Sequence, residues 1–580
     1  MTIAMSLMLA ASVATARAAS LPAVESDTFM VVADQHLAAE AGAAILRAGG
    51  NAVDAAVAVG YAEAVVNPCC GNIGGGGFMT LHLADGRDIF LDFRETAPGA
   101  AFAGMYLDEK GEVVKGASVA GWRSVAVPGS VLGLDTALTR YGRLSRAQVM
   151  QPAIDLARDG FVLVRADADI LGYGAQRLRG DRQAADIFLR PDGSPLQPGD
   201  RLTQPALADT LAAIAAHGPD AFYRGHIPQA IEAAARQGGG IITAADFAAY
   251  TVRETPPLRC AYRGWEVMSA PPPSSGGATL CEILNIIGGY DVRAMGFHSA
   301  AEVHLLAEAM RHAFLDRNTA LGDPAFVRNP LERLLSQDYA ASIRAVIGPR
   351  ATPSSELPPG TPPHEKSETT QFSVLDRAGN AVSVTYTING GFGAAVTAPG
   401  AGFLLNDEMD DFTIKPDAPN MFGLVQGAAN AIAPGKRPLS SMAPTIVLYN
   451  GRVALVLGSP GGARIITVTL ETLVNLIDHD MKPQEAVDAP RLHLQWLPDT
   501  LYAEPYALSP DTAALLRGMG YDISVQSPWG AAETIFVGPA PAPPGAPSPG
   551  NDAALSGRLR PGWFYGANDA RRPAGAAIGE

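Results

Sequence analysis

Two threonines, Thr369 and Thr387, stand at the open end of an expected β-hairpin. Apolar and polar residues alternate from position 372 to 386, and Arg377-Ala378-Gly379-Asn380 in the middle is typical of a turn. Such a hairpin brings position 369 beside position 387. A threonine hydroxyl is a good nucleophile when the free amine of the same residue takes its proton. Thr369 could therefore carry out acyl transfer, but only if the chain is cut in front of it.

Two glycine runs could also take part in chemistry. Gly458-Ser459-Pro460-Gly461-Gly462 precedes an apolar-periodic helix expected over Ile465–Ile477, where free N–H groups and the helix dipole suit an oxyanion. Helix capping alone explains these glycines equally well. The other run, Gly74 to Gly77, follows a helical pattern and leads into a strand over Phe78–Leu83. A phosphate loop needs the order strand, loop, helix, so we interpret this run as a close-packed turn.

Arg94 follows the expected strand Ile89–Phe93. An arginine at the end of a strand can hold a carboxylate through two parallel hydrogen bonds. A surface ion pair is the simpler explanation from the residues alone.

The composition excludes several kinds of partner and cofactor. The chain has 580 residues, 47% of them hydrophobic, which is enough for one large domain or two ordinary ones. Its formal net charge is -15 and no run of Lys or Arg occurs, so neither nucleic acid nor an anionic membrane is an expected partner. There is no CxxC or HExxH motif and the ten histidines are scattered, so we expect no metal and no cofactor.

The first residues resemble a secretory leader. An apolar run, Ile3 to Thr15, ends at Ala16-Arg17-Ala18, which predicts a signal peptide over residues 1–18 and an exported protein, periplasmic or secreted. The charged start of such a leader is missing, and a buried helix is the alternative. No later apolar stretch reaches the roughly 18 residues of a membrane-spanning helix.

The four cysteines do not form a disulfide scaffold. Cys69 and Cys70 are adjacent, a spacing that disfavours a mutual bridge. Cys260 and Cys281 flank a strand-like segment and could pair in an oxidising compartment. Four small buried hydrophobic residues are an equally good interpretation.

Residues 130–345 are mainly helical in pattern, whereas strands follow residue 369 and include a second hairpin, Thr445–Leu457, with Asn450-Gly451 at its turn. This order suits two packed sheets with helices on both outer faces.

Together these segments resemble the gamma-glutamyltransferase (gamma-glutamyltranspeptidase, glutathione hydrolase) family of N-terminal-nucleophile hydrolases, from about Phe29 to Gly566. The resemblance is carried by Gly49-Gly50-Asn51-Ala52-Val53-Asp54-Ala55-Ala56, Gly74 to Phe78, Asp92 to Glu95, Pro271 to Gly277, Thr369-Thr370, Leu405 to Phe412, Lys436 to Met442 and Gly458 to Gly462. It implies an α+β fold, a four-layer αββα sandwich, made as a precursor that cuts itself between Glu368 and Thr369. The products would be a large subunit (19–368) and a small subunit (369–580) that remain together as a heterodimer.

The resemblance also implies a role for each matched residue. Thr369 would be the nucleophile, Thr387 would position it, and Gly461 and Gly462 would form the oxyanion hole. The substrate would be glutathione or another γ-glutamyl compound, and the acceptor water, an amino acid or a dipeptide. Arg94, Ser440 and Ser441 would bind its α-carboxylate, while Asn389, Glu408 and Asp411 would bind its ammonium group.

Two features depart from the family pattern. Phe422 stands where many bacterial members have a tyrosine, on a loop expected to cover the pocket, and the Cys69-Cys70 pair has no counterpart that we recognise. Two other functions remain open: a cephalosporin (glutaryl) acylase on the same scaffold, and an unprocessed, inactive homologue that only binds.

Overall fold

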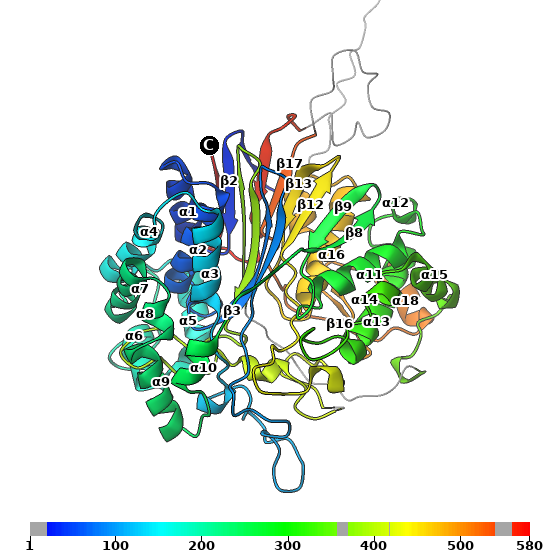
Figure 1. Cartoon of the computed structure of the whole chain (residues 1–580). Helices are drawn as coiled ribbons and strands as arrows, with labels where there is room; N and C mark the ends of the chain where they lie inside the picture. The colour runs from blue at the N-terminus through cyan, green and yellow to red at the C-terminus, as the bar shows by residue number, and fades with distance from the viewer. Residues whose placement is uncertain (1–19, 357–368, 417, 540–558) are drawn as a thin grey trace, which may run out of the picture.

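The computed structural model contains two seven-stranded β-sheets packed face to face, with helices on both outer faces (Figure 1). It describes residues 20–356, 369–416, 418–539 and 559–580. The expected four-layer αββα sandwich is confirmed. The leader (1–18) and Glu368 lie outside the described residues. None of the described helices is long and apolar enough to cross a bilayer.

The first sheet holds the hairpin that contains the threonines. In spatial order its strands are β19 (Ala576–Gly579), β2 (Phe29–Ala33), β10 (Thr370–Asp376), β11 (Ala381–Thr387), β3 (Gly76–His82), β4 (Asp88–Phe93) and β7 (Arg253–Thr255). The strands of the second sheet, in spatial order, are β1 (Val24–Ser26), β18 (Phe564–Ala567), β17 (Thr534–Val537), β13 (Arg452–Leu457), β12 (Thr445–Tyr449), β9 (Trp265–Ser269) and β8 (Leu258–Tyr262).

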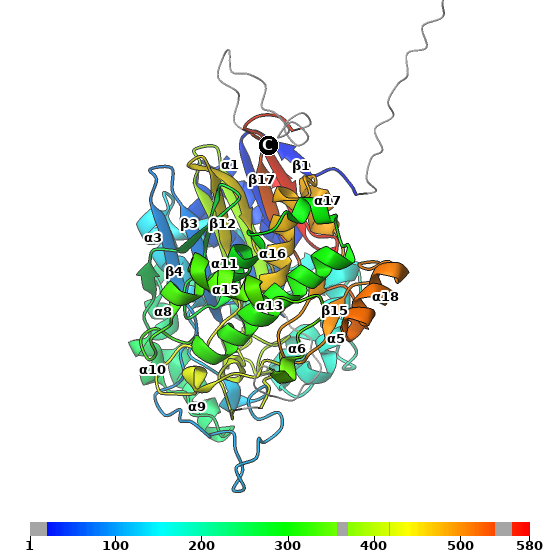
Figure 2. The same cartoon turned by 90° about the vertical axis from the view of Figure 1, so that its right-hand side faces the viewer.

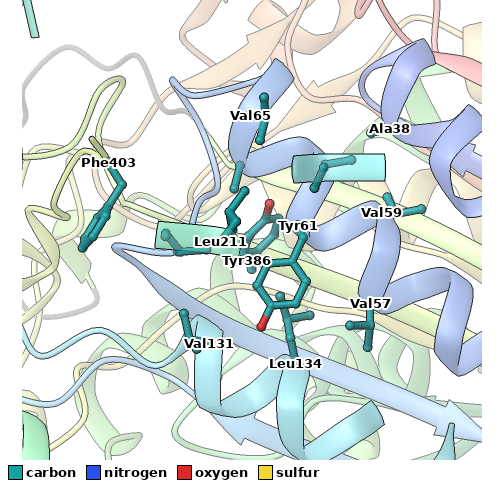
Figure 3. Close-up of a cluster of buried hydrophobic side chains, with 14 of the residues drawn as sticks. Ala38, Val57, Val59, Tyr61, Val65, Val131, Leu134, Leu211, Tyr386 and Phe403 are labelled. Carbon is teal, nitrogen blue, oxygen red and sulfur yellow. The ribbon is translucent and has the colours of Figure 1, made fainter. Parts of the chain in front are cut away.

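Helices from the first half of the chain cover the first sheet. They are α1 (His36–Arg47), α2 (Ala52–Val66), α3 (Ser130–Tyr141), α4 (Arg146–Asp159), α5 (Arg165–Leu178), α6 (Arg182–Phe188), α7 (Pro205–His217), α8 (Asp220–Tyr223), α9 (His226–Gln237) and α10 (Ala244–Ala249). Their core includes Tyr61 of α2, Leu134 of α3 and Tyr386 of β11 (Figure 3). Two short strands, β5 (Phe161–Val162) and β6 (Arg201–Leu202), pair beside these helices.

A second helical layer covers the other sheet and faces the viewer in Figure 2. It consists of α11 (Gly276–Ile287), α12 (Val292–Met295), α13 (Ala300–Ala320), α14 (Leu331–Leu334), α15 (Gln337–Val346), α16 (Arg464–Ile477), α17 (Pro483–Asp488) and α18 (Pro510–Met519), with a small sheet of β14 (Leu492–His493), β15 (Leu501–Ala503) and β16 (Ile523–Val525). The region 130–345, which the sequence pattern predicts to be mainly helical, also contains strands β7, β8 and β9 besides β5 and β6.

Successive side chains of β10 point to opposite faces of the sheet, and both faces are buried. Phe372 and Val374 pack into the helical core of the first sheet, whereas Leu375 lies in the apolar cluster between the sheets. Polar side chains on that inner face link the sheets: Ser373 Oγ donates to Glu533 O at 2.7 Å and Ser383 Oγ donates to Leu457 O at 2.9 Å. Because both faces are buried, the pairing of β10 cannot slip by one residue without burying the wrong side chains.

Both predicted hairpins are confirmed. Thr370 pairs with Tyr386 in the β10–β11 ladder, which places Thr369 beside Thr387. In the second hairpin Asn450 and Gly451 both have positive φ, at 51° and 72°, as a two-residue turn of this kind requires.

The cysteines form two disulfides in the described chain. The bridge from Cys260 to Cys281 joins β8 to α11, which settles a pairing that the sequence left open. Cys69 and Cys70 are also bonded, so the expectation from their adjacency was wrong. The carbonyl groups of this pair accept the N–H groups of Ile388 and Phe392, so it supports the chain just beyond β11.

The glycines before β3 allow close approach of backbones, as expected. A Cβ on Gly75 would overlap the carbonyl oxygen of Thr387, and one on Gly77 would overlap the backbone of β11. The run is therefore structural, and it fixes where the end of β11 lies.

We predict that Gly75→Ala destabilises the protein by about 1–3 kcal/mol, since the new methyl group must push β11 away. Urea denaturation measures this change. Gly172→Ala in α5 is the matched control, because its Cβ would meet its nearest atom at 4.0 Å, and it should be neutral or slightly stabilising. Equal stability of Gly75→Ala and the unaltered protein would contradict the close-approach argument.

Candidate active site

A small cleft opens beside Thr369. Every site residue expected from the sequence lines it, except Gly461, the immediate neighbour of the lining residue Gly462. The lining comprises Arg94, Arg317, Thr369, Thr387, Asn389, Glu408, Asp411, Phe422, Leu424, Ser440, Ser441, Met442, Gly462, Ala463 and Ile465. Segments more than 300 residues apart in the chain thus meet at one place.

The two threonine hydroxyls are in contact in this cleft. Thr369 is 5% exposed and its Oγ1 donates to Thr387 Oγ1 at 3.4 Å. Thr387 Oγ1 also accepts the N–H of Asn389 at 2.8 Å. Asn389 has a φ of 74°, so the backbone turns back on itself directly after β11 and holds the Thr387 hydroxyl in place.

The glycine loop before α16 borders the cleft through Gly462. Gly461 and Gly462 have φ values of 133° and 54°, conformations that other residues rarely adopt. Their carbonyl groups accept the N–H groups of Arg464 and Ile465, which starts the helix. Within the described parts of the chain neither glycine N–H has a hydrogen-bond acceptor. This arrangement suits stabilisation of an oxyanion.

Arg94 is fully buried, so the surface ion pair that the residues alone favoured was wrong. Its guanidinium contacts the carboxylates of Glu408 and Asp411 and lies 3.4 Å from that of Glu95. Burial, the largest influence, lowers the pKa of Arg94, but these three carboxylates together raise it above its ordinary value. The arginine does hold carboxylates, and in this structure they are the protein's own.

Burial raises the pKa of three carboxyl groups in this part of the protein. Burial raises the pKa of Glu95 to about 7 and that of Asp407 to about 8. It raises the pKa of Glu408 well above its ordinary value, although the charge of Arg94 opposes this. Of these three groups, Glu408 lines the cleft, where an incoming charged ligand can change its charge.

The side-chain oxygens of Ser440 and Ser441 each accept one hydrogen bond from another group of the protein. Ser440 Oγ accepts the N–H of Met442 at 3.1 Å, and Ser441 Oγ accepts Nη2 of Arg317 at 3.0 Å. The backbone of Ser440 is fixed by Pro273 and Ser275, so the Pro271–Gly277 segment acts as a support for the serines and as the turn before α11. Both hydroxyl protons remain available to an anion in the cleft.

A loop on the cleft carries Phe422, as expected for a covering segment. Phe422 is 5% exposed, and its N–H donates to Asn420 Oδ1 at 2.9 Å. Its carbonyl group accepts Nε2 of Gln495 at 3.1 Å. The phenyl ring supplies an apolar wall where a tyrosine would supply a hydroxyl group.

Arg317 also lines the cleft, and it was not among the residues predicted from the sequence. It lies on α13 and is 1% exposed. The one available signal was an arginine among the apolar positions of a long helix, and Arg311 on the same helix has that signal without lining the cleft.

Comparisons with known proteins identify the family of this chain. The family model described as gamma-glutamyltranspeptidase matches residues 38–575. A glutathione hydrolase proenzyme of Pseudomonas sp. (strain A14) is 54% identical over 563 residues, covering 97% of this chain and 96% of that protein. The acylase ACY 1 proenzyme of Pseudomonas sp. (strain SE83) is 43% identical over 505 residues, covering 86% and 88%.

Among solved structures, the cephalosporin acylase from Bacillus halodurans superposes with a TM-score of 0.82 at 26% identity, covering 99% of both chains. The family model spans nearly the whole chain, and the first of these relatives shares more than half of its residues. The chain belongs to the gamma-glutamyltranspeptidase family.

Proposed function

We propose that this enzyme cleaves the γ-glutamyl amide bond of glutathione and related compounds and transfers the γ-glutamyl group to water, an amino acid or a dipeptide. Thr369 Oγ1 attacks the γ-carbonyl carbon, and the free α-amine of Thr369 takes the hydroxyl proton and passes it to the leaving amine. Water or an acceptor amine then attacks the resulting ester and releases Thr369. One observation carries the proposal: Thr369, its partner Thr387 and the groups suited to both charged ends of the substrate line a single cleft.

The oxygen of the attacked carbonyl becomes negatively charged in each half-reaction. The N–H groups of Gly461 and Gly462 are the donors for that oxygen, since they have no acceptor among the described residues and stand at the start of α16. Both half-reactions pass through the same nucleophile, so ping-pong kinetics are expected.

The α-carbon of the substrate carries one ammonium group and one carboxylate. The carboxylate binds Arg94, Ser440 and Ser441, and the ammonium group binds Asn389, Glu408 and Asp411. In the absence of substrate Arg94 contacts the two acids. When a zwitterion binds, its carboxylate takes the place of the acids at Arg94, and its ammonium group takes the place of Arg94 at the acids. No charge in the site is then left unpaired.

Thr369 must first be freed. The proposal places the cut at the Glu368–Thr369 bond, giving a large subunit (19–368) and a small subunit (369–580) after export and loss of the leader. Glu368 lies outside the described residues, whereas Thr369 already stands in the cleft beside Thr387. Export to the periplasm or the medium rests on the leader-like start of the sequence.

We predict that Thr369→Ala remains a single uncut chain without γ-glutamyl transfer, because the same hydroxyl attacks the preceding carbonyl and later the substrate. Intact mass and N-terminal sequencing measure the cut, and γ-glutamyl-p-nitroanilide reports turnover. Thr370→Ser is the matched control: it alters the adjacent residue, keeps a hydroxyl and should be cut and active. Two normal subunits from Thr369→Ala would refute the nucleophile, and a single uncut band from the unaltered protein would favour an inactive binding homologue.

We also predict that Thr387→Val lowers kcat on the order of 10- to 100-fold, with a smaller change in KM. Valine keeps the shape but removes the oxygen that accepts from Thr369 and from the N–H of Asn389. Thr387→Ser keeps that oxygen and should retain most of the activity. A Thr387→Val enzyme with an unchanged kcat would show that this hydroxyl does not position the nucleophile.

The second candidate is a glutaryl (cephalosporin) acylase, favoured by the acylase relative and by the superposition on an acylase. A glutaryl group lacks the ammonium group, so Asn389, Glu408 and Asp411 would have no partner on it. We therefore expect kcat/KM for γ-glutamyl-p-nitroanilide to exceed that for glutaryl-p-nitroanilide by on the order of 10-fold or more, the loss of a charged hydrogen bond. A preference for the glutaryl compound would reverse the assignment.

A further inference from the structure

Arg317 is a buried cation that has no carboxylate partner among the described residues. Its side chain donates only to neutral oxygens: Nε to Ser275 Oγ at 3.1 Å, Nη1 to Asn318 Oδ1 at 2.8 Å and to Gln426 Oε1 at 3.0 Å, and Nη2 to Ser441 Oγ at 3.0 Å. No carboxylate oxygen lies within 4 Å of it in the described structure. Arg94, the other arginine of the cleft, contacts three carboxylates.

Such a charge is costly to bury unless an anion reaches it. Burial lowers the pKa of Arg317 to about 10, which still leaves the guanidinium charged near neutral pH. A guanidinium has five N–H groups and four are used here, so one remains, on the Nη2 nitrogen that holds Ser441. The positive charge of the cleft that is not already neutralised therefore lies beside Ser441.

The contacts of Arg317 reach both serines. Ser441 Oγ accepts from it, so the Ser441 proton must point elsewhere. Ser275 Oγ accepts from Arg317 and donates to the carbonyl oxygen of Ser440 at 2.6 Å. One guanidinium thus fixes the side chain of Ser441 directly and the backbone of Ser440 through one hydroxyl group.

The same side chain is linked to the acidic side of the cleft. Gln426 Oε1 accepts from Arg317, and Gln426 Nε2 donates to the carbonyl oxygen of Asp411 at 3.1 Å. Arg317 therefore connects the serines and Asp411, the groups proposed to bind opposite charges on the same α-carbon.

We propose that Arg317 is a specificity-determining residue for the α-carboxylate of the γ-glutamyl donor: it holds Ser441 as a hydrogen-bond donor and supplies the positive charge that draws this carboxylate into the cleft. This inference rests on the proposed function. The two arginines then have different roles, because Arg94 contacts the acids that bind the ammonium group whereas Arg317 does not.

The test compares two donors that differ only in the α-carboxylate, γ-glutamyl-p-nitroanilide and 4-aminobutanoyl-p-nitroanilide. For Arg317→Met we expect kcat/KM to fall on the order of 10- to 100-fold with the first donor, mainly through KM, and to change less than about twofold with the second. Arg317→Lys restores the charge but not the fork of donors, so it should recover part of the loss. As a second measurement, inhibition by L-glutamate should weaken in Arg317→Met while inhibition by 4-aminobutanoate should not.

Arg311→Met is the matched control, because it removes another buried arginine of α13, one that contacts Glu308, Ser354 and Asp499 away from the cleft. Any loss in this variant should be equal for both donors. An equal loss for both donors in Arg317→Met, with L-glutamate inhibition unchanged, would overturn the inference. If Arg317→Met does not fold, Arg317→Gln gives the same comparison and the same two outcomes. Absence of γ-glutamyl turnover in the unaltered enzyme would instead refute the proposed function.

Discussion

Backbone pairing between β10 and β11 sets the distance between Thr369 and Thr387, and most of the site is arranged around that pair. The register is fixed from both faces, since Phe372 packs on helices and Leu375 packs between the sheets. A shift by one residue would turn the Thr369 side chain to the opposite face. The glycines before β3 add a second restraint, because they let the backbone of the neighbouring strand lie directly against the end of β11.

The charges of the cleft are arranged around that fixed pair and are mutually dependent. Arg94, Glu408 and Asp411 are all buried, and each is tolerated because the others are present. Removing Arg94 entirely would therefore strand two carboxylates as well as weaken binding of a ligand. Arg317 contacts no carboxylate among the described residues. The neutral amides and hydroxyls around it stabilise the guanidinium without cancelling its charge.

Local sequence signals predicted the parts of the fold that depend on neighbouring residues. Helix α2, Ala52–Val66, begins where Asn51 caps it, and it is rich in alanine, the residue with the highest helix propensity. The Asn450-Gly451 turn was equally clear, since few residue pairs accept two positive φ angles. The grouping of the site residues came from the family resemblance, because no local rule joins Arg94 to Asp411.

What the sequence could not predict depends on long-range packing. Arg94 is buried because the loop that carries Glu408 and Asp411 packs against it. The residues of β4 and its neighbours in sequence give no sign of that loop. Arg317 and Arg311 have the same helical environment in sequence, yet only one reaches the cleft. The Cys69–Cys70 bridge likewise depends on how the chain between α2 and β3 folds against the segment after β11.

The strand order also explains how a cut chain stays in one piece. In the first sheet β10 and β11 lie between β2 and β3, and β19 closes the edge beside β2. In the second sheet β18, β17, β13 and β12 lie between β1 and β9, which come from the first half of the chain. The proposed cut in front of Thr369 would thus leave two chains that both contribute strands to each sheet. Because neither chain has a complete sheet of its own, folding must come before cutting. The ladders that join β10 to β2 and β11 to β3 then hold the two subunits together and also fix the hairpin that carries Thr369.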